Sequence, residues 1–222
     1  MPGSSGSKHL GPFSLSHAAD ETAKLIRAHA KNRKCHVVGF SGGGYVGVTL
    51  AHKYPELVQS LFISGVYDLK CWGRILYLAP YSSVMQSWLP ASLVSFVYAK
   101  MGSQNPPGLH EDAKANTSNL KIQKTAWNSL KEFDDGYPLI MRALVVAGGN
   151  QDDLSGTQRL SDMFRTGNEE SRAVVLNGAM HMWCMQRPEL FADAVKSWIE
   201  ERPLPAEFEL LTGRDTSKVL NG

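Results

Sequence analysis

Short apolar runs alternate along the chain with segments whose apolar residues recur every three or four positions. The runs are bounded by glycine or polar residues, and they predict buried strands at 35–39, 57–65, 143–149 and 172–176. The periodic segments predict helices at 14–31, 45–54, 157–165 and from Pro188 to the residues before Pro203. Strands that alternate with helices favour an α/β fold, with a mostly parallel sheet, right-handed crossovers and helices on both faces.

The two ends of the chain carry weaker patterns. Residues 1–13 are rich in glycine, serine and proline, so we expect a loop there. The following helix, 14–31, is expected to bury one apolar stripe, made of Leu15, Ala18, Ala19, Thr22, Leu25 and Ile26. The residues after Pro203 are mostly polar, and 211–222 are predicted to be a loose tail.

The pattern changes between about residues 72 and 135. A dense set of aromatic and aliphatic residues, broken by Pro80 and Pro90, is followed by the polar stretch 102–119. This predicts several short helices inserted between the second and third strands. Their apolar residues either pack the insertion onto the core or line an apolar substrate pocket, and the pattern favours neither. We expect a single domain over 1–210 that contains this insertion.

Composition excludes several classes of protein. A length of 222 residues and an apolar fraction of 43% suit one globular domain with a real core. The net charge of +2 argues against nucleic acid or a membrane surface as a partner. Three scattered cysteines, Cys35, Cys71 and Cys184, are too few for a disulfide framework or a zinc site. Without a signal peptide or a membrane helix in the pattern, we expect a cytoplasmic protein with no metal or cofactor.

The first predicted strand runs into Gly39-Phe40-Ser41-Gly42-Gly43, and a predicted helix follows at once. A strand and a helix can cross at such short range only where the residues two before and two after the serine are small. Gly39 and Gly43 are expected to meet that need. The serine at the apex is then held in strained backbone, with its hydroxyl clear of the sheet. We therefore take Ser41 as a candidate nucleophile.

Two other interpretations of this stretch stay open. Gly42-x-Gly44-x-x-Gly47 matches a dinucleotide fingerprint, and Asp68 stands about 20 residues on, where a ribose-binding acid is expected. That would make the chain a nucleotide-binding oxidoreductase. The stretch could also be a glycine-rich turn without chemistry. Neither interpretation accounts for an acid and a histidine that follow later strands.

A serine nucleophile needs a base within hydrogen-bond reach, and the base needs an acid to orient it. Parallel sheets place functional groups on the loops after the carboxyl ends of their strands. Asp152 follows the third predicted strand and His181 follows the fourth. Asp153 and Asp68 are alternative acids. The backbone N–H of Gly42 is expected to stabilise an oxyanion.

The Gly-x-Ser-x-Gly turn, the order Ser41, Asp152, His181, and the His181-Met182-Trp183 run after a strand together resemble the α/β-hydrolase family. The resemblance implies a serine hydrolase of esterase, thioesterase or lactonase type with a Ser-His-Asp triad, and it makes the insertion a lid. The aromatic content of that insertion points to a small, fairly apolar carbonyl substrate. Residues 188–192 and 203–209 also resemble fungal hydrolases of secondary metabolism.

The resemblance covers residues 2 to about 210, but only the later part of the family's fold. Residues 2–7, Pro-Gly-Ser-Ser-Gly-Ser, resemble the family segment that leads into the helix before the serine turn. The family's first strands and the loop with the second oxyanion donor are therefore expected to be missing, which leaves the edge at Val37 and Val38 unpaired. Losing one oxyanion donor typically raises the barrier by about 2.7–4 kcal/mol. The alternative function is an impaired enzyme, a binding protein on this fold, or a fragment completed by another chain.

Overall fold

The computed structural model describes residues 2–3, 5–67, 79–86, 88–100, 120–131, 133 and 137–212. The chain forms two compact units, and each is described by itself. The first comprises Met1–Ala18 and Leu69–Phe133, and the second comprises Ala19–Asp68 and Asp134–Gly222. The single domain expected over 1–210 stays a prediction.

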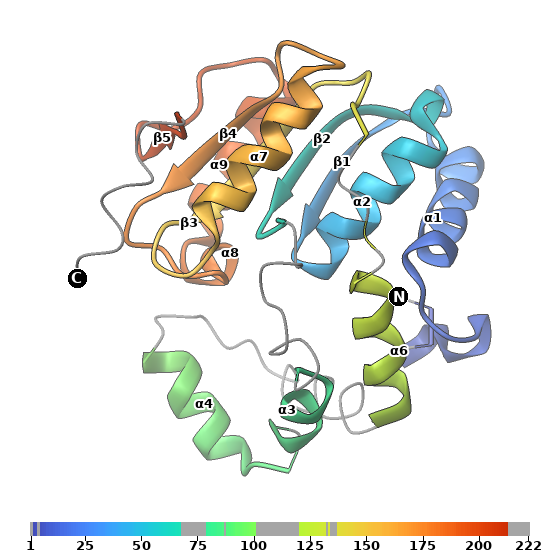
Figure 1. Ribbon diagram of the computed structural model, residues 1–222, viewed down its shortest axis with the longest axis vertical. Coiled ribbons are helices and arrows are strands. Elements are labelled where there is room, and N and C mark those ends of the chain that lie inside the picture. Colours follow the sequence, from blue (N-terminus) through green and yellow to red (C-terminus); the bar gives the residue numbers. More distant parts are fainter. Residues whose placement is uncertain are drawn as a thin grey trace. The chain divides into compact units, whose positions relative to one another are not determined.

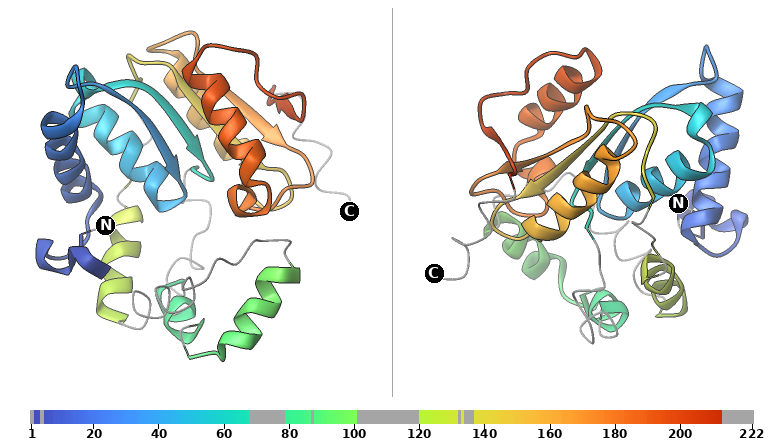
Figure 2. Two further views of the ribbon diagram at one scale, coloured as in Figure 1. Left: turned by 180° about the vertical axis from the view of Figure 1, so that it is seen from behind. Right: turned by 45° about the horizontal axis from the view of Figure 1, so that its top comes forward.

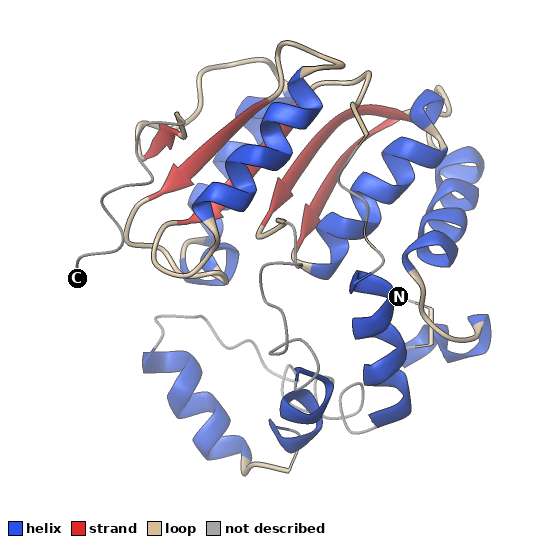
Figure 3. Ribbon diagram, in the orientation of Figure 1, coloured by secondary structure: helices blue, strands red, loops and turns tan. Residues whose placement is uncertain are grey.

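The second unit is built on a five-stranded sheet, drawn in red in Figure 3. Its strands are β1 (Cys35–Phe40), β2 (Val58–Ser64), β3 (Ala143–Gly148), β4 (Arg172–Leu176) and β5 (Phe208–Leu210). They are hydrogen-bonded in the order β1-β2-β3-β4-β5, with β1 to β4 parallel and β5 antiparallel to β4. The four predicted strands are therefore confirmed within a residue or two, as is the α/β fold. β5 was not predicted, because three residues among polar neighbours carry no pattern.

Helices cover both faces of this sheet. Figure 1 shows α2 (Gly42–Lys53) and α7 (Leu154–Arg165) on one face. Figure 2 shows α9 (Pro188–Ile199) on the other face. A short 3-10 turn η2 (Pro55–Leu57) leads into β2, and one turn of helix, α8 (Trp183–Gln186), precedes α9.

The core of this unit explains why β3 reads as a continuous apolar run. All six residues of β3 are buried, since helices lie on both sides of it. The cluster between the sheet and α9 is apolar throughout, and its buried members are Phe62, Leu144, Val146, Val174, Leu176, Ala179, Trp183, Ala194 and Trp198. β1 pairs only with β2 among the described residues, so it forms an edge, and Val38 is 42% exposed there.

Helix α1 (Leu15–His29) begins where the sequence placed it. Ser14 caps it, because its Oγ accepts the N–H of His17 at 3.1 Å. The buried stripe differs from the predicted one: Leu25 is 60% exposed, and Ala23 is fully buried instead. Consecutive helical residues point about 100° apart. A stripe through Ala19, Ala23 and Ile26 therefore turns Leu25 outward.

The first unit contains short helices. Those in the insertion, where the pattern predicted them, are α3 (Ala79–Gln86), α4 (Ala91–Lys100) and α6 (Leu120–Lys131), and η1 (Ser5–Leu10) lies before it. Pro80 stands in the first turn of α3 and Pro90 directly before α4, the places where a helix tolerates proline. The loop expected at 1–13 is wrong for Ser5–Leu10, which form a 3-10 helix. None of the helices among the described residues is long and apolar enough to cross a membrane.

Candidate active site

Ser41 stands at the turn between β1 and α2 in a backbone conformation that side chains rarely adopt, with φ 50° and ψ −122°. Such a conformation costs on the order of 1–3 kcal/mol and persists only where its surroundings enforce it. Two hydrogen bonds do so here. The N–H of Ser41 donates to the carbonyl of Ser64 at the end of β2, at 2.8 Å. The carbonyl of Ser41 accepts the N–H of Gly44 at 2.8 Å.

The small residues around Ser41 serve close packing of strand and helix. A Cβ atom on Gly39 would lie 2.6 Å from Cα of Gly44, so the prediction for Gly39 is confirmed. The prediction for Gly43 is wrong, because a Cβ atom there would meet nothing within 4 Å. The residue that must stay small is Gly44, whose Cβ would overlap the side chain of Val66. Position 43 points away from the strand in the first helical turn, whereas position 44 faces it.

Two glycines of the possible dinucleotide fingerprint, Gly44 and Gly47, have a packing role. Gly44 faces Val66, and a Cβ atom on Gly47 would lie 3.2 Å from Cδ1 of Leu61. The absence of a side chain at both positions therefore lets α2 pack closely on the sheet. Asp68, the acid of that fingerprint and one of the alternative triad acids, lies outside the described residues. Packing of helix on sheet thus accounts for two of the three glycines of the fingerprint.

Asp152 and His181 are joined by a short hydrogen bond. Oδ1 of Asp152 lies 2.6 Å from Nδ1 of His181, and the carboxylate is fully buried while the imidazole is 26% exposed. Oδ2 of the same carboxylate accepts the N–H of Gly148 at 2.7 Å. Both oxygens of Asp152 therefore have a donor. A neutral His181 that donates from Nδ1 carries its free lone pair on Nε2, the nitrogen that could act as a base.

Asp153, the neighbouring alternative acid, has a different task. It is the N-cap of α7: its Oδ1 accepts the N–H of Gly156 at 3.0 Å and the hydroxyl of Ser155 at 2.7 Å. Of the two adjacent aspartates, the structure brings Asp152 to His181 and Asp153 to the helix N-terminus.

The surroundings of Ser41 and of His181 meet at the carboxyl edge of the sheet. The ring of Phe40, the residue before Ser41, lies 5.0 Å from the imidazole of His181, centroid to centroid. Gly65, the residue after Ser64, has φ +67°, and a Cβ atom on it would lie 2.8 Å from Nδ1 of His181. His181 is thus packed against the residues that flank both ends of the Ser41–Ser64 hydrogen bond.

The loop that carries His181 is held by side chains to which the sequence assigned no role. Oε1 of Gln151 accepts the N–H of His181 at 3.0 Å, and Oε1 of Gln186 accepts the N–H of Met180 at 3.1 Å. Nε1 of Trp183 donates to Oγ of Ser64 at 2.7 Å. The sequence contained one indication of a role for Ser64. It is a polar residue at the carboxyl end of a predicted strand, and Ser41 directly follows the end of another.

Gly42, the predicted oxyanion donor, opens α2. The first N–H groups of a helix have no acceptor within the helix, and the helix dipole favours negative charge at that end. The position therefore suits an oxygen that becomes negative. No group of three or more metal-ligating side chains occurs in the described part of the chain.

The family follows from a comparison of the whole chain. A family model described as "Alpha/beta hydrolase family" matches residues 1–194. The chain belongs to this family. The match spans most of the chain and includes the turn at Ser41, both adjacent aspartates and the loop at His181, so the resemblance seen in the sequence is confirmed.

Individual proteins also resemble the chain over most of its length. An AB hydrolase superfamily protein of Gibberella zeae is 29% identical over 218 residues, which span 95% of this chain and 72% of that protein. The fold resembles that of E-2-(acetamidomethylene)succinate hydrolase, with a TM-score of 0.63, 19% identity, and coverage of 86% of this chain and 75% of the other. A thermophilic esterase from Thermogutta terrifontis gives a TM-score of 0.61 at 19% identity, over 86% of this chain and 74% of the other.

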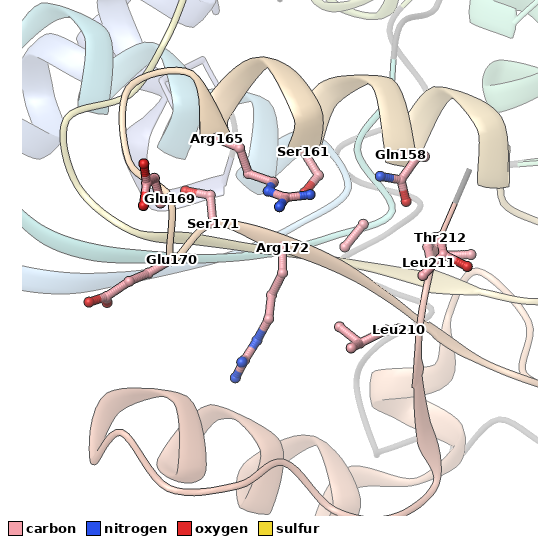
Figure 4. Close-up of a pocket in the computed structure, with 11 residues that line it drawn as sticks. Gln158, Ser161, Arg165, Glu169, Glu170, Ser171, Arg172, Leu210, Leu211 and Thr212 are labelled. Carbon is pink, nitrogen blue, oxygen red and sulfur yellow. The ribbon is translucent and has the colours of Figure 1, made fainter. Parts of the chain in front are cut away.

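A separate hollow of about 380 Å³ lies between α7, the start of β4 and the residues after β5. Figure 4 shows Gln158, Ser161 and Arg165 reaching into it from α7, with Leu210 and Leu211 beside β4. None of its lining residues is Ser41, Asp152 or His181. It is therefore distinct from the candidate active site of this hydrolase.

Proposed function

We propose that the chain is a serine hydrolase of esterase, thioesterase or lactonase type, with Ser41, His181 and Asp152 as its catalytic triad. The observation that carries the proposal is the 2.6 Å hydrogen bond between the buried carboxylate of Asp152 and Nδ1 of His181. It orients the imidazole and stabilises its charged form, which is what a base for a serine hydroxyl requires. The esterase among the structures of similar fold agrees with this reaction class.

In this mechanism Nε2 of His181 takes the hydroxyl proton of Ser41 as Oγ attacks the carbonyl carbon of the substrate. The carbonyl oxygen becomes negative and accepts the N–H of Gly42. The tetrahedral intermediate then collapses and expels the alcohol or thiol, which receives the proton from Nε2. Water repeats the sequence on the acyl-enzyme, with His181 again taking and returning the proton, and releases the acid. Asp152 stays ionised throughout.

The proposed substrate is small and fairly apolar. The support is the composition of the insertion, whose described helices carry Tyr81, Met85, Leu93 and Phe96. In this proposal the insertion serves as the lid. Trp72 and residues 75–78, also part of that apolar set, lie outside the described residues.

A fluorophosphonate probe tests the triad directly, because it phosphonylates only an activated serine. We expect labelling of the purified protein at Ser41, with none in Ser41→Ala. In His181→Ala and Asp152→Asn, labelling should fall by about three to four powers of ten, since the base is removed or held in the wrong tautomer. Asp153→Asn is the matched control and should label within about threefold of the wild type, because Asp153 caps a helix.

Labelling at another residue, or none in a folded protein, would contradict this proposal. The absence of labelling would favour a binding protein on the hydrolase fold or a chain completed by a second one. A fluorescent apolar ester that binds without being cleaved would then identify the binding protein.

A further inference from the structure

The end of strand β2 contacts both halves of the candidate active site. The carbonyl of Ser64 accepts the N–H of Ser41 at 2.8 Å, while its hydroxyl accepts the indole N–H of Trp183 at 2.7 Å. Trp183 follows His181 by two residues. One residue therefore holds the nucleophile through its backbone and the histidine loop through its side chain.

The bond between Ser64 and Trp183 lies in the interior of the protein. Both side chains are fully buried, and Trp183 belongs to the apolar cluster between the sheet and α9. Its ring packs against Phe191 at 5.1 Å and against Phe208 at 5.6 Å, centroid to centroid. An indole N–H is a donor only, and when it is buried it needs an acceptor. The position of that acceptor therefore determines the orientation of the ring. The hydroxyl of Ser64 is that acceptor.

The loop that carries His181 is bound to the rest of the unit at several points. The hydrogen bond to Asp152 fixes Nδ1, but the place of Nε2 also depends on the backbone of the loop that carries the ring. That backbone is bound at its start, where the side chains of Gln151 and Gln186 accept the N–H groups of His181 and Met180. The other end of the loop is bound through Trp183 to Ser64 of β2, the residue whose carbonyl accepts the N–H of Ser41.

We infer that Ser64 and Trp183 are positioning residues, which keep Nε2 of His181 in register with Oγ of Ser41. This inference rests on the proposed function. A misplacement of about 1 Å between reacting groups can reduce a rate by about a hundredfold. Losing either side of the bond should therefore slow the reaction at Ser41 although neither side chain touches the reacting atoms.

The test compares Ser64→Ala, Trp183→Phe and the double variant. Trp183→Phe keeps an aromatic ring in the cluster and removes only the N–H donor and the second ring. We expect the second-order rate of fluorophosphonate labelling to fall by about 10- to 100-fold in each single variant. The labelling rate of the double variant should fall no further than that of the slower single variant, because both substitutions remove the same hydrogen bond.

Ser60→Ala is the matched control. Ser60 lies on the same strand, is also fully buried, and its Oγ is 2.7 Å from a ring nitrogen of His36. It should lower stability much as Ser64→Ala does and leave the labelling rate unchanged. A second readout is the downfield proton resonance of His181 Nδ1–H in the hydrogen bond to Asp152. We expect it to shift or broaden in Ser64→Ala and Trp183→Phe, and not in Ser60→Ala.

Equal labelling rates and unchanged resonances in Ser64→Ala and Trp183→Phe would overturn the inference and leave the bond a structural one. If the wild type does not label at all, the proposed function fails. The resonance still decides the inference in that case, because it reports the position of the His181 ring without any reaction.

Discussion

Gly65 lies directly against the imidazole of His181, and a Cβ atom on Gly65 would stand 2.8 Å from Nδ1 of the ring. Nδ1 is the ring nitrogen that is hydrogen-bonded to Asp152. The imidazole ring therefore leaves no room for a side chain at position 65.

We predict that Gly65→Ala lowers the labelling rate at Ser41 by at least about a hundredfold, since the imidazole must move away. The substitution also costs about 1–2 kcal/mol of stability, because Gly65 has φ +67°. Gly178→Ala is the control: it has φ +75°, but a Cβ atom there meets nothing within 4 Å. It should lose similar stability and keep its labelling rate. Equal labelling in the two variants would contradict the prediction.

Helix α7 offers a test of the separate roles of the adjacent aspartates. Asp153→Ala removes the N-cap of α7, and we expect a loss of about 1 kcal/mol in the free energy of unfolding. Labelling at Ser41 should persist. Asp162→Ala on the exposed side of the same helix should cost less than about 0.5 kcal/mol, because its hydrogen bond to Gln158 and its ion pair with Arg165 are exposed to solvent. Denaturant midpoints measure both, and a loss of labelling in Asp153→Ala would reverse the assignment of the two acids.

The backbone of Ser41 is expected to store strain that glycine would release. With φ 50° and ψ −122°, the residue is in a region where a Cβ atom is unfavourable. Ser41→Gly should therefore be more stable than Ser41→Ala by about 1 kcal/mol, the strain relieved less the entropy that glycine loses on folding. Urea unfolding of the two inactive variants gives the comparison directly. An alanine variant that is the more stable would mean that the turn carries no strain.

Arg142, the residue before β3, caps the C-terminus of α9. Its guanidinium is nearly buried, donates to the carbonyl of Trp198 at 2.8 Å, lies 3.3 Å from the carboxylate of Glu201, and stacks 4.4 Å from the centre of the Trp198 ring. Charged hydrogen bonds of this kind each contribute about 1.5–3 kcal/mol. We expect Arg142→Met to lower the free energy of unfolding by about 2–3 kcal/mol.

The control for Arg142 is Arg172, whose guanidinium lies over the same Trp198 ring at 5.4 Å but is exposed. Arg172→Met should cost no more than about 1 kcal/mol, the size of an exposed cation–π contact. Thermal or urea unfolding distinguishes the two. Equal losses would show that the hydrogen bond to the helix end contributes nothing.

His36 should make stability depend on pH. Burial, and then the positive charge of Arg142, hold the pKa of His36 below its ordinary value of 6.5, while Glu201 opposes them. The folded state therefore favours the neutral ring. The stability that the neutral His36 ring contributes is fully present above the pKa of this residue in the unfolded chain. It is lost as the pH falls through 6.5 toward the lower pKa of His36 in the folded protein.

We expect the free energy of unfolding to rise with pH across that window, and the rise to be smaller in His36→Gln. Urea unfolding between about pH 5 and pH 8 measures the difference between the two proteins. Since the other histidines are present in both, the difference isolates His36. Parallel pH profiles would contradict the lowered pKa.

Local patterns determined much of this protein. A short apolar run such as that of β3 can be buried on both faces only in a sheet covered by helices, so runs of this kind predicted the α/β fold. The turn at Ser41 was equally local, because the strand, the glycines and the helix that form it are consecutive in the chain. Ser41, Asp152 and His181 follow the first, third and fourth parallel strands, which placed all three at one sheet edge, and their catalytic roles stay a proposal.

Contacts between distant residues decided the rest, because their chemistry is not visible in any single stretch. Asp152 and Asp153 have identical side chains, and only the fold turns one toward His181 and the other toward the N-terminus of α7. Gly44 rather than Gly43 must stay small because Val66 packs against it. The bond between Ser64 and Trp183 joins residues 119 positions apart. Sequence periodicity reports which face of an element is buried, whereas the tertiary structure determines which atoms meet there.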